Sequence, residues 1–308
     1  MNQSQSVKIG KTDVLIAPKL GLGTNKVGGH NLFKGLKDTD GKAVIKTALD
    51  EGISLLDTAF MYGLGRSEEI IGEVLQEYDR AQVILATKAA QDVRKDYQPN
   101  NEPEFLKNAV EQALKRLHTD YIDIFFIHFP DKTTPKDEAV AALAALKKEG
   151  KIRAIGVSNF SLAQLKEANK NGEVDLVEDN YSLVQRTAEK ELFPYLKEQQ
   201  ISFVPYYPLA SGLLTGKYQA TDRDKFERFT PAQFKQIIAA LVQVKELAQK
   251  HAATVAQVIL AWYLQNPALS VVIPGARKPE QVQNNVGALN VELTPAEYTQ
   301  IDKLFRGF

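Results

Sequence analysis

Eight short apolar runs recur along the chain, and each leaves room for a helix before the next. They begin at residues 19, 53, 83, 121, 152, 174, 201 and 270. Their apolar residues are continuous rather than alternating, which is typical of parallel strands covered on both faces. A parallel sheet whose strands are joined by helices is therefore expected.

The segments between these runs carry helical patterns. Residues 104–117, for example, place apolar side chains at three- and four-residue spacing. Residues 7–19 favour a β-hairpin with a turn near Gly10–Asp13. The other helices are expected at 40–51, 137–149, 161–170, 188–199, 233–250, 254–266, 278–289 and 294–305.

The strand and helix pattern predicts one α/β domain over residues 1–308, a (β/α)8 TIM barrel. The barrel would carry an N-terminal β-hairpin and extra C-terminal helices, because 254–266 exceeds one helix per strand. The alternative is a doubly wound open sheet, which would carry a glycine-rich phosphate loop after its first strand. Residues 21–29, GLGTNKVGG, lack the G-x-G-x-x-G spacing and precede no immediate helix.

Composition excludes several classes of function. Lys plus Arg and Asp plus Glu both number 38, so a zero net charge argues against a nucleic-acid or membrane-surface partner. The chain has no cysteine, which removes disulfides and thiolate metal sites. No apolar run is long enough to span a membrane, and no Sec signal is visible. We expect a cytoplasmic protein, monomeric or weakly self-associating.

Four polar residues fall at one end of three consecutive predicted strands. Asp57 ends the second run, with Tyr62 five residues later, while Lys88 ends the third and His128 the fourth. Plainer roles exist for each, as a helix cap for Asp57, a surface lysine for Lys88 and a core histidine for His128. Their coincidence at the C-terminal strand ends, where barrel active sites lie, favours a catalytic set.

These side chains suit protonation of a carbonyl oxygen. A free tyrosine has a pKa of about 10, and a nearby ammonium such as Lys88 lowers it. Asp57 could hold Lys88 in place, and His128 could donate a hydrogen bond to the substrate oxygen. The set has no electron source, so redox chemistry would require a cofactor.

Six motifs in order resemble the aldo-keto reductase superfamily, especially its bacterial NADPH-dependent members. They are DTAFMYG at 57–63, Lys88, IHFPD at 127–131, GKIRAIGVSNF at 150–160, YYPLASGLLTGKY at 206–218 and IPGARKPEQVQNN at 273–285. The resemblance covers nearly the whole chain. It implies an NADPH-dependent oxidoreductase (EC 1.1.1.-) that reduces small-molecule aldehydes or ketones to alcohols by hydride transfer, without a metal.

The resemblance also assigns roles to individual residues. Tyr62 would be the general acid, Lys88 and Asp57 would tune it, and His128 would orient the carbonyl. The substrate pocket would include Asn25, Phe33, Phe60, Tyr62, His128 and Phe129. NADPH or NADP+ would contact Gly23, Thr24, Asp57, Ser158, Asn159, Glu178, Tyr206, Tyr207, Pro208, Leu209, Gly212, Leu213, Lys217, Gly275, Arg277, Gln281, Asn284 and Asn285.

Two positions depart from the family pattern. Glu178 stands where the family usually has Gln, and an ionised Glu accepts hydrogen bonds but donates none. Asn284 stands where an acidic residue often meets the adenine. Two other functions stay open: an NADP(H)-binding regulatory or sensor subunit with little turnover, and a barrel aldolase that uses Lys88 as a Schiff base.

Overall fold

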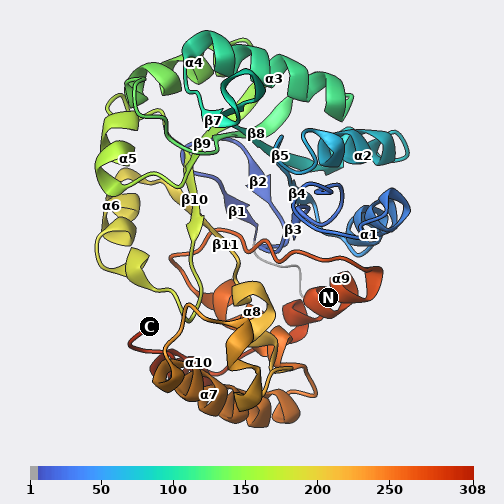
Figure 1. Ribbon diagram of the computed structural model, residues 1–308, viewed down its shortest axis with the longest axis vertical. Coiled ribbons are helices and arrows are strands. Elements are labelled where there is room, and N and C mark those ends of the chain that lie inside the picture. The colour runs from blue at the N-terminus through green and yellow to red at the C-terminus, as the bar shows by residue number, and fades with distance from the viewer. Residues whose placement is uncertain (1–5) are drawn as a thin grey trace.

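Seven parallel strands form the centre of the molecule (Figure 1). The computed structural model describes residues 6–308. Along the sheet the strands lie in the order β11, β10, β9, β8, β5, β4, β3, so neighbours in space follow one another in the chain. Their bounds are β3 Leu22–Gly23, β4 Leu55–Asp57, β5 Ile84–Ala89, β8 Ile122–Ile127, β9 Ile152–Ser158, β10 Leu176–Asn180 and β11 Ser202–Tyr206.

The eighth predicted run closes the sheet into a barrel. The Ser270 N–H donates to the Phe203 carbonyl on β11 at 2.9 Å, and the Val272 N–H donates to Lys19 beside β3 at 3.0 Å. Isolated parallel bridges replace a continuous ladder here, because Pro274 has no N–H to donate. The predicted (β/α)8 barrel is confirmed, although its eighth strand is irregular.

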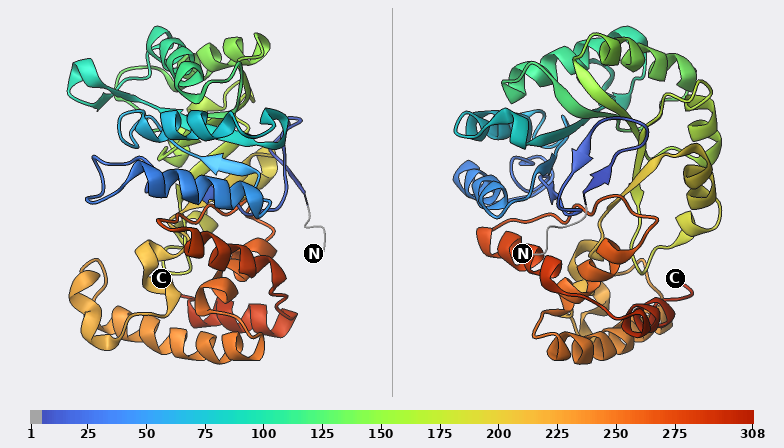
Figure 2. Two further views of the ribbon diagram at one scale, coloured as in Figure 1. Left: turned by 90° about the vertical axis from the view of Figure 1, so that its right-hand side faces the viewer. Right: turned by 180° about the vertical axis from the view of Figure 1, so that it is seen from behind.

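Ten α-helices surround the barrel in the described residues. They are α1 Asp38–Asp50, α2 Arg66–Leu75, α3 Pro103–Leu117, α4 Lys136–Lys148, α5 Leu162–Ala168, α6 Leu192–Gln199, α7 Pro231–Lys250, α8 Val255–Gln265, α9 Pro279–Val286 and α10 Pro295–Leu304. The predicted extra helices near the C-terminus of the chain are present, and α8 corresponds to the surplus segment 254–266. Helices α7 and α10 pack together at the bottom of Figure 1 (see also Figure 2). None of the helices in residues 6–308 has the length and apolarity to cross a bilayer.

Helix α2 was not predicted. Its glycine, Gly72, weakens the helical pattern of a ten-residue segment. Tertiary packing explains that glycine: a Cβ on Gly72 would lie 2.4 Å from the Arg116 carbonyl oxygen of α3. A small hairpin after β5 was also unpredicted, formed by β6 Gln91–Asp92 and β7 Gln98–Pro99.

The N-terminal hairpin is confirmed as β1 Val7–Lys8 paired with β2 Leu15–Ile16. It lies across one end of the barrel (Figure 1). The Gly10 N–H donates to the hydroxyl of Ser202, the first residue of β11, at 2.9 Å. The hairpin therefore covers the N-terminal ends of the strands and leaves the opposite end for polar side chains.

Apolar residues from every strand of the seven-stranded sheet after β3, and from the eighth run, fill the barrel interior. Successive side chains of a strand face opposite sides, so residues two apart share the interior. Gly156 leaves room there for Phe126, since a Cβ would lie 2.2 Å from that ring. The same interior cluster contains Leu55, Ala86, Ile124, Phe126, Ala154, Leu176, Val204, Val271 and Ile273, with Ile9, Val14 and Ile16 from the hairpin region.

Candidate active site

Two of the predicted residues, Asp57 and Lys88, form a buried ion pair at the C-terminal end of the barrel. Asp57 pairs in register with Ala86, so Lys88, two residues farther along β5, faces the same interior. The Lys88 ammonium donates to Asp57 Oδ1 at 2.6 Å and to the Thr58 carbonyl at 3.0 Å. Asp57 is 3% exposed and Lys88 is 1% exposed, so water screens their attraction little.

Glu178 joins this pair from across the barrel. It lies on β10, which β8 and β9 separate from β5. Its Oε2 lies 3.2 Å from Lys88 Nζ, without the geometry of a hydrogen bond. We call Asp57, Lys88 and Glu178 the charge cluster. It holds two carboxyl groups and one ammonium, all buried.

Burial and charge decide the protonation of the cluster. Burial, reinforced by the charge of Asp57, raises the pKa of Glu178 to about 8. Burial also raises the pKa of Asp57, against the opposing effect of Lys88. Burial alone would lower the pKa of Lys88, but Asp57 and Glu178 outweigh it and hold that pKa above its usual value. The lysine is therefore charged, and one proton on Glu178 makes the cluster neutral near pH 7.

Tyr62 and His128 lie beside the charge cluster. Lys88 Nζ lies 5.6 Å from the centroid of the Tyr62 ring. The Tyr62 and His128 rings meet edge to face, with centroids 6.4 Å apart. Burial raises the pKa of Tyr62 above its usual value, and Lys88 opposes that rise.

The same burial keeps His128 neutral. Burial and the Lys88 charge lower the pKa of His128 to about 3. Its Nδ1 is buried without a hydrogen-bond partner among residues 6–308. A neutral imidazole carries one N–H and one acceptor nitrogen. Lys88 and His128 at the ends of their strands and Tyr62 in the loop after β4 thus bring an ammonium, a neutral imidazole and a phenol together.

A second hydrogen-bonded group links the ends of β9 and β11. The Tyr206 hydroxyl donates to Asn159 Oδ1 at 2.8 Å. The Asn159 amide donates to the His128 carbonyl and to the Ser158 hydroxyl, both at 3.0 Å. Asn159 therefore connects two further predicted cofactor residues, Ser158 and Tyr206, to the backbone of His128.

Three cations, Lys26, Lys217 and Arg277, come from the loops after β3, β11 and the eighth run and lie near enough to repel one another. Burial, then the charges of Lys217 and Arg277, lowers the pKa of Lys26. Lys217 also lies close to the backbone of Gly212, since a Cβ there would be 3.6 Å from Nζ. Mutually repelling cations that persist in a fold indicate a site for an anion. The sequence analysis does not include Lys26 among the cofactor residues. Its place two residues after Thr24, in the loop at the C-terminal end of β3, is a signal that would have indicated it.

Several other predicted cofactor residues make contacts within the protein. Arg277 donates to the carbonyls of Lys34 and Gly35 at 3.1 and 2.8 Å. Gln281 Oε1 accepts from the Arg277 N–H at 2.7 Å. The Asn284 carbonyl accepts from Gln257 of α8 at 2.9 Å. Of the remaining predicted cofactor residues, Thr24, Leu213 and Asn285 are buried and Tyr207 is half exposed. The Pro208 carbonyl accepts from the Tyr263 hydroxyl, and Leu209 packs against the hydrophobic core. Gly23 and Gly275 form a parallel β-bridge with each other.

Three of the predicted pocket residues, Phe129, Phe33 and Asn25, lie beside other residues of the candidate site, whereas Phe60 packs against a helix. Phe129 packs against His128 with its ring tilted by 35° and the centroids 4.8 Å apart, and the Phe33 ring lies 5.7 Å from Lys26 Nζ. The Asn25 side-chain oxygen lies near Gly275, 3.4 Å from where a Cβ would be. Phe60 instead packs against the Arg116 guanidinium of α3, at 5.1 Å from the ring centroid.

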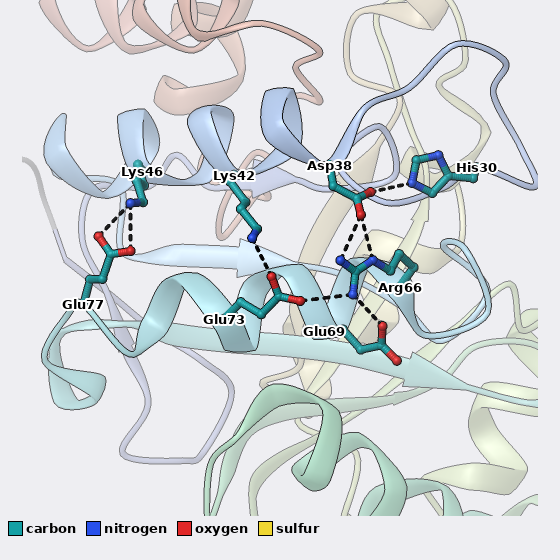
Figure 3. Close-up of polar contacts among 8 residues, drawn as sticks. All are labelled: His30, Asp38, Lys42, Lys46, Arg66, Glu69, Glu73 and Glu77. Atoms are coloured by element: carbon teal, nitrogen blue, oxygen red, sulfur yellow. Dashed lines mark hydrogen bonds and ion pairs between the residues drawn. The ribbon is translucent and has the colours of Figure 1, made fainter.

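An ion-pair network joins α1 and α2 next to this site (Figure 3). Arg66, four residues after Tyr62, pairs with Asp38 at 2.8 Å and Glu69 at 2.7 Å. His30 contacts the same Asp38 at 2.7 Å. The network thereby anchors the loop that follows β3 beside the turn that carries Tyr62.

Comparison with known proteins matches this arrangement to enzymes of one family. The Aldo/keto reductase family model matches residues 19–306. Aldo-keto reductase YhdN of Bacillus subtilis is 37% identical, over 87% of this chain and 83% of its own. NADH-specific methylglyoxal reductase of Escherichia coli is 35% identical, over 96% of both chains.

Solved structures agree with the sequence matches. Glycerol dehydrogenase AKR11B4 from Gluconobacter oxydans is 33% identical with a TM-score of 0.84, covering 97% of this chain and 94% of its own. An aldo/keto reductase from Klebsiella pneumoniae, in complex with NADP and acetate, is 28% identical with a TM-score of 0.78. That likeness covers 98% of this chain and 95% of the Klebsiella chain. On the family match and these relatives, the chain belongs to the aldo/keto reductase family of oxidoreductases.

Proposed function

We propose that this protein is an NADPH-dependent carbonyl reductase that converts aldehydes or ketones to alcohols, with Tyr62 as the general acid. The observation that carries the proposal is the meeting of the Tyr62 phenol, the Lys88 ammonium and the neutral His128 ring at one end of the barrel. Consumption of NADPH with a panel of aldehydes and ketones, followed by absorbance, tests it. No turnover with any of them would contradict it.

The side chains fit a dinucleotide with an anionic linker and an added phosphate. Lys26, Lys217 and Arg277 supply the positive charge, and guanidinium pairs well with phosphate. Ser158, Asn159 and Tyr206 would hold the nicotinamide beside His128. The chemistry supplied by a bound reduced nicotinamide is a hydride for the carbonyl carbon. Relatives of both cofactor types exist, since the Klebsiella structure holds NADP and the Escherichia coli enzyme is named NADH-specific.

The chain's own residues would control the proton. Tyr62 would donate its phenol proton to the carbonyl oxygen as negative charge develops there. Lys88 would stabilise the resulting tyrosinate, because a cation beside a phenolate favours its charged form. With Nδ1 enclosed, the remaining nitrogen of neutral His128, Nε2, would donate to the same oxygen and orient it.

The two alternative functions receive less support. A Schiff-base lysine must lose its proton to act as a nucleophile, whereas the buried carboxyl groups of Asp57 and Glu178 hold Lys88 protonated. Borohydride trapping of a carbonyl substrate on Lys88 would support the aldolase function instead. A regulatory subunit would bind NADPH without turning over a generic aldehyde, so the same assay separates it from a reductase.

Arg277 should decide the preference for NADPH over NADH. A charge-assisted contact with the 2′-phosphate contributes about 1.5–3 kcal/mol, so Arg277→Ala should weaken NADPH about tenfold or more and leave NADH nearly unchanged. Fluorescence titration of both cofactors measures this. Arg277→Lys is the matched control, since it keeps the positive charge. Equal losses for both cofactors would assign Arg277 the structural role of holding Lys34 and Gly35 instead.

Glu178 should make cofactor affinity depend on pH. Its pKa of about 8 means that the carboxyl group is mostly protonated at pH 7 and gains a negative charge as the pH rises through that value. A negative charge near the ring favours the cationic NADP+ over the neutral nicotinamide of NADPH. The preference for NADP+ should therefore grow about threefold to tenfold between pH 7 and pH 9, the effect of one ordinary interaction.

The Glu178→Gln substitution should abolish this pH dependence. At high pH the variant should bind NADPH more tightly, relative to NADP+, than the wild type does. Dissociation constants for NADPH and NADP+, measured from pH 6 to pH 9 on both proteins, give the ratio. An identical pH dependence in the variant would show that Glu178 does not act on the cofactor and serves only as a partner of Lys88.

A further inference from the structure

Asn31, in the loop after β3, contacts both peptide groups that flank Tyr62. Its side-chain N–H donates to the Met61 carbonyl at 3.1 Å. Its side-chain oxygen accepts from the Gly63 N–H at 2.8 Å. One amide side chain thus occupies both hydrogen-bonding groups, as a neighbouring strand would.

We infer that Asn31 is a positioning residue for Tyr62, fixing the backbone on both sides of the proposed general acid. The inference rests on the proposed role of Tyr62. The Tyr62 phenol must lie within hydrogen-bond reach of a substrate oxygen. If the backbone that carries it moves, the rate of reduction falls, because small displacements of a reacting group are costly in catalysis. Asn31 touches neither reacting group and acts only through the turn.

The turn needs this outside support. It holds itself by short-range bonds, from the Tyr62 N–H to the Ala59 carbonyl at 3.0 Å and from the Gly65 N–H to the Phe60 carbonyl at 2.7 Å. Neither bond uses the Met61 carbonyl or the Gly63 N–H. Asn31 satisfies both groups and so restrains the two peptide planes that set the direction of the Tyr62 side chain.

Glycines let the loop approach the turn closely enough for this contact. A Cβ on Gly63 would lie 1.9 Å from the Gly28 carbonyl oxygen, and Gly63 has a φ of +75°. A Cβ on Gly28 would lie 2.5 Å from the Ser67 nitrogen at the start of α2. The two backbones are in direct contact, so the position of Asn31 is set by packing as well as by its own hydrogen bonds.

The loop is also fastened on both sides of Asn31. On one side, His30 contacts Asp38, which pairs with Arg66 of α2 (Figure 3). On the other side, Arg277 holds the carbonyls of Lys34 and Gly35. Asn31 is therefore presented to the Tyr62 turn from an anchored segment.

The test is Asn31→Ala measured in single-turnover reduction at saturating NADPH. We expect the rate of reduction to fall about fivefold to thirtyfold, as expected for loss of orientation without loss of the reacting groups. The dissociation constant of NADPH and the thermal unfolding midpoint should stay close to wild type. Gln76→Ala is the matched control, because it removes a side-chain amide that donates to the Gly72 carbonyl at the far end of α2, and it should change the rate less than twofold.

The same substitution in a Tyr62→Phe background separates this inference from the proposed function. If Asn31 acts through Tyr62, Asn31→Ala should cost nothing further once the phenol is gone. An equal loss in both backgrounds, or a loss confined to NADPH affinity, would overturn the positioning role. Full activity of Tyr62→Phe alone would instead contradict the proposed general acid.

Discussion

Tyr62→Phe is expected to lower the rate of carbonyl reduction by about 10²- to 10⁴-fold, the usual contribution of general acid catalysis. The substitution removes the phenol oxygen and keeps the ring. Packing against His128 and the face presented to Lys88 should therefore survive, and NADPH affinity should stay within about twofold. Single-turnover rates and a fluorescence titration of NADPH give the two quantities.

Tyr78, a partly exposed tyrosine outside the candidate site, provides the control for Tyr62→Phe. Tyr78→Phe removes a hydroxyl that contacts Asp50 at 2.8 Å on the outer surface, so it should leave the rate unchanged. If Tyr62→Phe retains more than about a third of the wild-type rate when chemistry is rate-limiting, another group supplies the proton. Solvent or His128 would then be the donor to examine.

The barrel and the core of the site were predictable for the same reason. Continuous apolar runs predict parallel strands, and parallel strands of a barrel end on one side. The residues that end consecutive runs must therefore meet, and Asp57, Lys88 and His128 do. The eighth run departs from this regularity, because Pro274 has no N–H to donate and leaves isolated bridges in place of a continuous ladder.

Contacts that depend on side-chain reach or loop path were not predictable. Glu178 was expected beside the cofactor, and its contact with Lys88 requires a lysine long enough to cross the barrel interior. Asn31 and Lys26 lie in a loop without hydrophobic periodicity, so no pattern indicates which way it folds. Helix α2 is not evident from the sequence, because Gly72 has a low helix propensity. The close approach of the α3 backbone, which leaves no room for a Cβ, is what requires glycine at this position.

Lys88→Met should damage both activity and stability, because Lys88 is the only cation of the charge cluster. Without the ammonium, tyrosinate at position 62 loses its stabilising charge, and we expect the reduction rate to fall about 100-fold or more. Two buried carboxyl groups also lose their partner. Breaking a buried ion pair costs about 3–5 kcal/mol in the free energy of unfolding. Urea unfolding and single-turnover kinetics measure the two losses.

The double variant Lys88→Met with Glu178→Gln separates those losses. At high pH, where Glu178 would ionise beside Asp57, replacing it by a neutral amide removes the repulsion between two buried carboxylates, so part of the stability should return there. The rate should stay low, since Tyr62 still lacks a neighbouring cation. A rate restored along with the stability would mean that Lys88 serves folding alone. A Lys88→Met protein that reduces carbonyls within tenfold of wild type would likewise remove the ammonium from the mechanism, and Tyr62 would have to donate its proton unaided from a site whose burial opposes ionisation.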